Sequence, residues 1–173
     1  MKRHLQAELR QSKPFGSLEE EVFLEIQRTA QVGARWVAEA LKPSGLTPTQ
    51  FNVLRILRGS RPAGLPAGAI AERMVSHDPD LTRLLDRLEA SGLVEKSRDD
   101  EDRRVVRARI TPKGLRLVEQ ASENVSRAVQ APMKSLTASK LETLADLLEV
   151  VRQTGGRQTS SPSTGGSRHA SRK

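Results

Sequence analysis

The segment between Gly92 and Thr111 most restricts the possible fold, because its periodicity differs from that of the sequence around it. The runs "LVEKS" and "VVRARI" are short, rich in β-branched residues, and alternate apolar with polar side chains. One face of the second run carries Val106, Ala108 and Ile110, and the other carries Val105, Arg107 and Arg109. Two such runs around a charged turn predict a β-hairpin.

Helical segments are predicted on both sides of this hairpin. Ser17 with Glu20 three residues later is typical of a capping box. Three dipeptides place a capping residue before a proline suited to a first helical turn: Thr47-Pro48, Asp78-Pro79 and Thr111-Pro112. The expected helices cover about 17–41, 48–59, 67–74, 79–91, 112–131 and 138–152, with Gly59, Gly92 and Pro132 as stops. A mainly α chain with one hairpin after three short helices predicts a winged helix-turn-helix.

The basic charge of the chain is concentrated at its two ends. The formal net charge is +8, of which residues 1–14 carry +3, residues 153–173 carry +4, and the body carries +1. Residues 154–173 are mostly Gly, Ser and Thr with scattered basic residues, so we expect a disordered tail. That tail is either a weak electrostatic arm for DNA or a solubilising segment. A prediction of nucleic-acid binding must therefore depend on where particular arginines lie.

Several classes of protein are disfavoured by composition. The chain has no cysteine, which excludes disulfides and thiolate metal ligands and fits a cytoplasmic location. The histidines His4, His77 and His169 are too far apart to suggest a metal site, so we expect no metal and no cofactor. No apolar run approaches the ~18 residues of a membrane span, and the N-terminus lacks a signal peptide's apolar region. A Gly-rich phosphate loop or a nucleophile beside a base is also lacking, so an enzyme is not expected.

The helix expected between Asp78 and Gly92 divides into an apolar stripe and a polar face. The stripe is formed by Leu81, Leu84, Leu85 and Leu88, which follow helical spacing. The polar face carries Thr82, Arg83, Asp86 and Arg87, with Asp80 near its start. This division suits a recognition helix, in which leucines fix the helix and polar side chains reach base edges. The alternative is an ordinary amphipathic surface helix with Asp–Arg pairs.

The hairpin turn, "SRDDEDRR", combines acids with arginines. Arg98, Arg103 and Arg104 could reach a minor groove, although a charge run is also compatible with a solvated turn. Asp99, Asp100 and Glu101 are expected at the solvated turn. Asp102 is expected to orient the Arg104 guanidinium by a charge-assisted hydrogen bond.

The stretch from Leu46 to Gly114 resembles the MarR family of bacterial transcription regulators. The resemblance rests on "LTPTQFNVLRIL" and "TRLLDRLEASGLVEKSRDDEDRRVVRARITPKG". It covers about 70 residues closely, and the flanking helices match only in position and character. It implies a homodimeric winged-helix protein that binds palindromic operators in double-stranded DNA, often as a repressor. It also implies that a small effector, often a phenol or another aromatic anion, releases the DNA.

The resemblance also implies which residues contact DNA. Thr82 and Arg83 match the recognition-helix contacts, and Asp102 and Arg104 match a wing D-x-R pattern, with Arg103 at its variable middle position. The full candidate set is Pro79, Asp80, Thr82, Arg83, Arg87, Arg98, Asp102, Arg103 and Arg104.

The expected organisation has three parts. Residues 1–16 form a flexible N-terminal arm, residues 17–153 a single domain, and residues 154–173 the basic tail. Within the domain, 46–111 form the winged helix-turn-helix, and 17–42 and 112–152 are dimerisation helices. The last helix supports this assignment with an apolar seam of Leu141, Leu144, Leu148 and Val151. Packing within one chain is the alternative use of such seams.

An effector site is a further hypothesis. The urate-responsive branch of the family uses a tryptophan in the first long helix with charged residues near the recognition helix. Trp36, His77, Asp78 and Arg116 could form such a site here, although a tryptophan more often packs in a core or interface. The alternative function for the whole chain is a winged-helix protein-interaction module without sequence-specific DNA binding, which the nearly neutral body favours.

Overall fold

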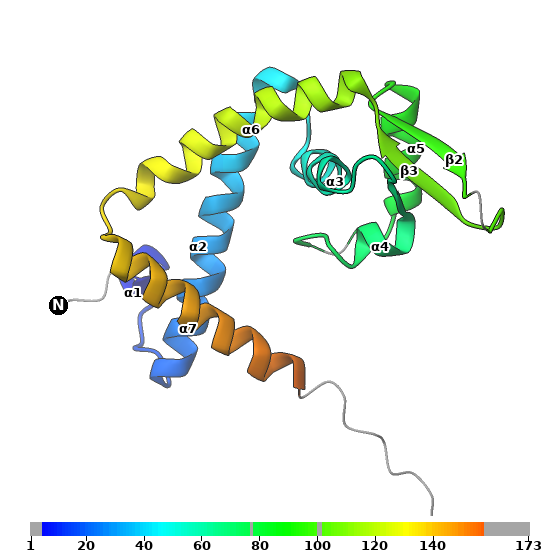
Figure 1. Ribbon diagram of the computed structural model, residues 1–173. Coiled ribbons are helices and arrows are strands. Elements are labelled where there is room, and N and C mark those ends of the chain that lie inside the picture. Colours follow the sequence, from blue (N-terminus) through cyan, green and yellow to red (C-terminus); the bar gives the residue numbers. More distant parts are fainter. Residues whose placement is uncertain (1–4, 77, 100–101, 158–173) are drawn as a thin grey trace, which may run out of the picture. The chain divides into compact units, whose positions relative to one another are not determined.

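The computed structural model describes residues 5–76, 78–99 and 102–157 (Figure 1). The architecture is mainly α with one small antiparallel sheet, as the sequence predicts. The chain divides between Ala131 and Pro132 into two compact units, whereas the sequence predicts one domain over 17–153. In order, the elements are α1 (Leu5–Glu8), α2 (Leu18–Leu41), η1 (Lys42–Ser44), α3 (Pro48–Gly59), β1 (Leu65–Pro66), α4 (Ala67–Ala71), α5 (Leu81–Ala90), β2 (Val94–Arg98), β3 (Val106–Ile110), α6 (Pro112–Met133) and α7 (Ala138–Arg157).

The N-terminal segment contains more structure than the flexible arm predicted over 1–16. Its described part includes helix α1, in which Leu5 is 2% exposed. Glu8 forms an ion pair with Arg28 of α2, with Glu8 Oε1 and Arg28 Nε 2.6 Å apart. Four residues are too few for a periodicity signal, which is why the sequence does not reveal α1.

Helix α2 begins where its capping residue predicts. The Ser17 hydroxyl accepts a hydrogen bond from the backbone N–H of Glu20 at 3.2 Å. The Glu20 carboxylate accepts from the N–H of Gly16 instead of closing the box on Ser17. Hydrogen bonds from its own backbone N–H and from Ser17 lower the pKa of Glu19, so this carboxylate stays charged at the positive end of the helix dipole.

Helices α3, α4 and α5 surround the core of the larger unit. A complete capping box between Thr47 and Gln50 starts α3. The four leucines of α5 are at most 7% exposed, and each contributes on the order of 1.5–3 kcal/mol by its burial. They pack with Phe51, Leu54, Leu57 and Ile70 of α3 and α4. The leucine stripe predicted from the sequence is confirmed.

The start of α5 corrects one prediction. Asp78 and Pro79 are expected from the sequence to cap and begin this helix, but it begins at Leu81 with Asp80 as its N-cap. Asp78 Oδ1 accepts a hydrogen bond from the backbone N–H of Asp80 at 2.8 Å. An aspartate that bonds the backbone two residues ahead stabilises a turn, and this turn replaces the predicted first helical turn.

The hairpin is confirmed, and a third strand joins it. Strands β2 and β3 pair antiparallel from Val94 opposite Ile110 to Arg98 opposite Val106. The sheet order is β1-β3-β2, with Leu65 of β1 opposite Ala108. Strand β1 has no signal in the sequence, because it is only two residues long and one of them is Pro66. Proline is tolerated there because β1 is an edge strand.

The two C-terminal helices are longer than predicted. Helix α6 continues through Pro132 to Met133, and α7 extends to Arg157 instead of about 152. A proline in the last turn removes few helical hydrogen bonds, so Pro132 does not end α6 where the sequence indicates. The basic tail predicted for 154–173 is therefore helical at 154–157, and its remainder lies outside the described residues. Among the described side chains of α7 none is buried.

The junction between hairpin and α6 depends on Gly114. A Cβ at this position would lie 2.2 Å from the carbonyl oxygen of Leu93 and 3.0 Å from Cγ1 of Ile110. The N–H of Gly114 donates to the hydroxyl of Thr111, and the N–H of Thr111 donates to the same Leu93 oxygen. The backbone in the first turn of α6 is therefore in direct contact with the backbone of Leu93.

We expect Gly114→Ala to destabilise the protein by about 1–3 kcal/mol, because backbone atoms must move apart to admit the methyl group. The midpoint of urea unfolding at fixed protein concentration measures this effect. Gly59→Ala is the matched control, because nothing lies within 4 Å of its Cβ position, and its effect should stay within about 0.5 kcal/mol. Equal midpoints for the two variants would contradict the close approach.

Candidate nucleic-acid interface

Helix α5 exposes a polar face opposite its buried leucines. Thr82, Arg83, Asp86 and Arg87 are all exposed. Arg83 Nη1 lies 3.4 Å from Asp80 Oδ2, and the Arg83 side chain is 80% exposed. A long ion pair in water contributes little free energy, so this guanidinium is available to another partner. No side chain caps the N-terminus of α5.

The hairpin turn is organised by Asp99. Its Oδ1 accepts a hydrogen bond from the backbone N–H of Asp102 at 3.1 Å. Its Oδ2 pairs with Nε of Arg107, and the Asp99 side chain is only 13% exposed. The prediction that Asp99 is a solvated turn acid is therefore wrong. Asp100 and Glu101, predicted beside it, lie outside the described residues.

Asp102 also differs from its prediction. Its Oδ1 accepts a hydrogen bond from the backbone N–H of Arg104 at 2.9 Å, and not from the guanidinium as the sequence suggests. A carboxylate reaches a backbone N–H two residues ahead at little cost, whereas holding an arginine side chain costs rotamer entropy. The two aspartates therefore shape the backbone of the turn that carries Arg104.

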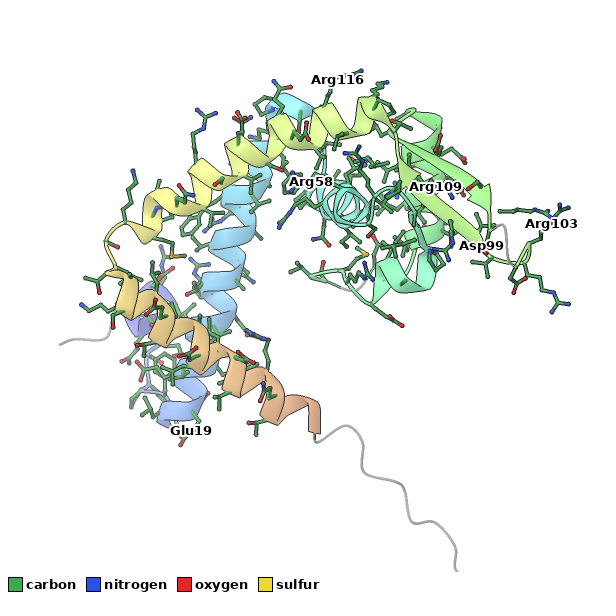
Figure 2. The ribbon with its side chains drawn as sticks, in the orientation of Figure 1. Glu19, Arg58, Asp99, Arg103, Arg109 and Arg116 are labelled. Carbon is green, nitrogen blue, oxygen red and sulfur yellow. The ribbon has the colours of Figure 1, made fainter. Side chains whose placement is uncertain are left out.

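The remaining candidate residues lie around the same region. Pro79 and Asp80 form the turn before α5, and Arg98 is the last residue of β2. Arg103 lies at the tip of the hairpin, beyond Asp99 (Figure 2). Arg98, Arg103 and Arg104 are all exposed.

A groove connects the helix with the hairpin. Its volume is about 450 Å³, and Thr82 and Asp86 line it from α5, while Lys96, Arg104 and Val106 line it from the hairpin side. The structure thus brings Thr82 and Arg104, 22 positions apart in the sequence, to one concave surface.

Lys96 links β2 to α5. Its Nζ lies 2.5 Å from Asp86 Oδ1 and 2.8 Å from Glu89 Oε2, and its side chain is 25% exposed. The hydrogen bonds that its ammonium donates, first to Asp86 and then to Glu89, raise the pKa of Lys96, so the ammonium stays protonated. The sequence does not single out Lys96. Its position two residues after the apolar Val94, on the same face of the strand, could have indicated that this lysine faces inward.

Two arginines of β3 bind within the protein. Arg109 donates to the hydroxyl of Ser97 at 2.8 Å and to the carbonyl oxygen of Ala63 at 3.2 Å. Arg107 holds Asp99 and contacts the carbonyl oxygen of Gly64 at 3.5 Å. These arginines tie the hairpin to the segment before β1. Sequence alternation places them on one face correctly but does not identify their partners.

Of the described residues proposed for an effector site, Trp36 lines a pocket that Asp78 and Arg116 do not line. Trp36 lines a pocket of about 400 Å³ with Glu39, Ala40, Pro43, Asn124, Arg127 and Ala128. Asp78 lies in the turn before α5, and Arg116 is exposed on the side of α6 facing away from α3 (Figure 2). Neither lines this pocket, and His77 lies outside the described residues. Arg127, which sequence reasoning missed, is the basic residue beside Trp36, and no sequence pattern marks it.

The charges of this pocket are partly compensated. Glu39 pairs with Lys42 at 2.6 Å, and Arg127 Nη2 donates to Asn124 Oδ1 at 2.7 Å. Asn124 is neutral, so the positive charge of Arg127 is not cancelled by this contact. The pocket therefore combines an indole and apolar walls with a guanidinium.

Neither a metal site nor a membrane span is found in the described residues. No group of three or more His, Asp or Glu side chains there could hold a metal ion. No helix in the described part of the chain is both long and apolar enough to cross a membrane.

Comparison with known proteins places this geometry in a family. The family model described as "MarR family" matches residues 46–106. The multiple antibiotic resistance protein MarR of Salmonella typhimurium is 34% identical over 113 residues, which cover 64% of this chain and 76% of that protein.

Solved structures agree. A mutant MarR from E. coli complexed with operator DNA is 31% identical, with a TM-score of 0.69 over 79% of this chain and 99% of that one. CouR from Rhodococcus jostii bound to p-coumaroyl-CoA is 25% identical, with a TM-score of 0.68 over 79% of this chain and 95% of that one. The mainly helical fold with its small antiparallel sheet is thus similar to that of solved MarR regulators, and the chain belongs to the MarR family of transcriptional regulators.

Proposed function

We propose that this protein is a DNA-binding transcriptional repressor that acts as a homodimer on a palindromic operator and releases it when a small aromatic or anionic effector binds. The observation that carries the proposal is the exposed face of α5, whose Thr82 shares a groove with Arg104 of the wing. The likeness to an operator-bound relative supports the same use of these elements.

In this proposal α5 enters the major groove. Arg83 can bond guanine bidentately, and Thr82 can bond a base or contact a thymine methyl. Arg87 lies one turn further along the same exposed face. The N-terminus of α5, beside Pro79 and Asp80, has no side-chain cap, so its backbone N–H groups suit a phosphate oxygen.

The wing is proposed to enter the adjacent minor groove through Arg104, with Arg98 and Arg103 near the backbone. All three arginines are exposed, as insertion requires. The narrow minor groove attracts arginine through its negative potential. Asp99 and Asp102 contribute by fixing the turn and not by binding DNA.

A homodimer is proposed through the helices of 17–42 and 112–152, with 46–111 as the DNA-binding region. Each candidate dimerisation region carries exposed apolar side chains, among them Phe23 at 57% and Leu147 at 60%. Burial against a second copy would remove these side chains from water. Two copies would then present α5 to half-sites about one helical turn (~10 bp) apart.

The alternative is a winged-helix module that binds proteins without reading DNA sequence. Selection of duplexes from a random-sequence pool by the wild-type protein separates the two. Enrichment of a palindrome with protected half-sites supports the repressor, whereas a pool without any enriched motif supports the module.

On the selected duplex, Arg83→Ala and Arg104→Ala should change different properties of DNA binding. Arg104→Ala should weaken binding by about 1–3 kcal/mol while keeping the central base preference, and Arg83→Ala should relax that preference. Fluorescence anisotropy with single-base variants of the duplex measures both effects. Arg10→Ala removes the same charge from an exposed residue outside the proposed dimerisation and DNA-binding regions and serves as the control. An unchanged affinity for Arg104→Ala would remove the wing assignment.

Asp102→Ala should weaken operator binding even though it makes the protein more positive, because the backbone of Arg104 loses its hydrogen-bond acceptor. Asp102→Asn should bind nearly as the wild type does, since an amide oxygen can accept the same N–H. Anisotropy titrations at one salt concentration compare the three proteins. Tighter binding by Asp102→Ala would instead favour a simple electrostatic effect.

The effector is proposed to bind beside Trp36, the only tryptophan of the chain. Its indole offers a stacking surface, and Arg127 offers an anion partner. We therefore expect salicylate or urate to change Trp36 fluorescence in a saturable manner. Arg127→Ala should weaken that response, and Arg116→Ala should leave it unchanged. No saturable change with either compound in the wild type would exclude these two as effectors at this site.

A further inference from the structure

We infer that Lys96 is a positioning residue that sets the separation between α5 and the wing by binding two carboxylates of α5 from strand β2. The inference rests on the proposed function, because it explains how the two DNA-contacting elements could keep a fixed spacing.

Three contacts of one residue make this link. The Lys96 ammonium binds Asp86 at 2.5 Å and Glu89 at 2.8 Å. Its backbone N–H also donates to the other oxygen of Glu89, Oε1, at 3.1 Å. Asp86 and Glu89 are three residues apart and therefore lie on the same side of α5. One residue of the sheet thus holds nearly a full turn of the helix.

The local packing gives this contact its importance. Lys96 lies opposite Ala108 in the sheet, and Ala108 is 2% exposed. Alanine carries no side-chain atom beyond Cβ. In this cross-strand pair, Lys96 is therefore the residue long enough to contact α5. Its side chain lines the groove shared by Thr82 and Arg104, which places the link beside the proposed DNA contacts.

The same contacts direct the charge of Lys96 into the protein. Asp86 and Glu89 stand on the helix that carries Arg83 and Arg87, where their charges would repel phosphate. The ammonium compensates part of that charge and is held by both carboxylates, so it is not arranged to bind the DNA backbone.

Two interpretations of Lys96 predict opposite results for its partners. If Lys96 bound phosphate, the double variant Asp86→Asn/Glu89→Gln would free it and strengthen DNA binding. If Lys96 positions the wing, this double variant and Lys96→Met should both impair the wing contact, although the first removes two negative charges and the second removes one positive charge.

The test is hydroxyl-radical footprinting of the full chain on the duplex selected by the wild-type protein. We expect Lys96→Met and the double variant to lose the flanking minor-groove protection and to keep the central protection. Lys96→Arg should restore part of the flanking protection, because a guanidinium can bind both carboxylates. Lys13→Met, which replaces an exposed lysine before α2 and outside both the proposed dimerisation helices and the DNA-binding region, removes the same charge and should give the wild-type footprint.

A second measurement needs no DNA. Amide hydrogen exchange in β2 and β3 should be faster in Lys96→Met and in the double variant than in the wild type or Lys13→Met. Unchanged exchange in both variants would overturn the inference, as would full flanking protection or tighter binding by the double variant. If the wild type selects no duplex while exchange changes as expected, the proposed function fails and the link between α5 and the wing remains.

Discussion

The burial of the four leucines of α5 is the interaction on which the proposed DNA-binding region depends. Because these side chains are fixed in the core of α3 and α4, α5 can turn only one face to solvent, and that face carries Thr82, Arg83 and Arg87. Hydrophobic burial has no directional preference of its own. Because it fixes the apolar side of α5 in the core, however, it decides which polar side chains of the helix stay in solvent. The direction of the candidate DNA contacts is therefore set by residues that are themselves buried.

The charged side chains of the proposed DNA-binding region are divided between ion pairs within the protein and exposed groups. Asp99 with Arg107 and Lys96 with Asp86 and Glu89 form ion pairs that hold the hairpin and join it to α5. Arg83, Arg103 and Arg104 remain exposed. A body of nearly neutral net charge is thus compatible with binding a polyanion, because several acids pair with basic groups that hold the fold while other arginines stay exposed.

Much of the fold can be predicted from short-range sequence signals. The capping residue Thr47 before Pro48, the leucine stripe and the alternation in β3 each depend on neighbours within a few residues, and each is present in the structure. Strand β1 and the start of α5 are not predicted correctly, because a two-residue strand exists only through its partner and because Asp78 prefers a turn. The candidate site is predictable as a set of exposed residues, but their partners are not. Asp99 and Lys96 depend on residues brought near by the fold, and periodicity does not report such contacts.

The edge strand β1 has a consequence for how copies of this chain can meet. Pro66 has no N–H to donate, and β1 ends after two residues, so this side of the sheet offers almost no backbone to an incoming strand. The opposite edge, β2, carries charged side chains, which discourage strand addition as well. The sheet is thereby protected against growing from one molecule into the next. Many copies bound at neighbouring stretches of DNA would therefore not aggregate by adding strands to one another's sheets.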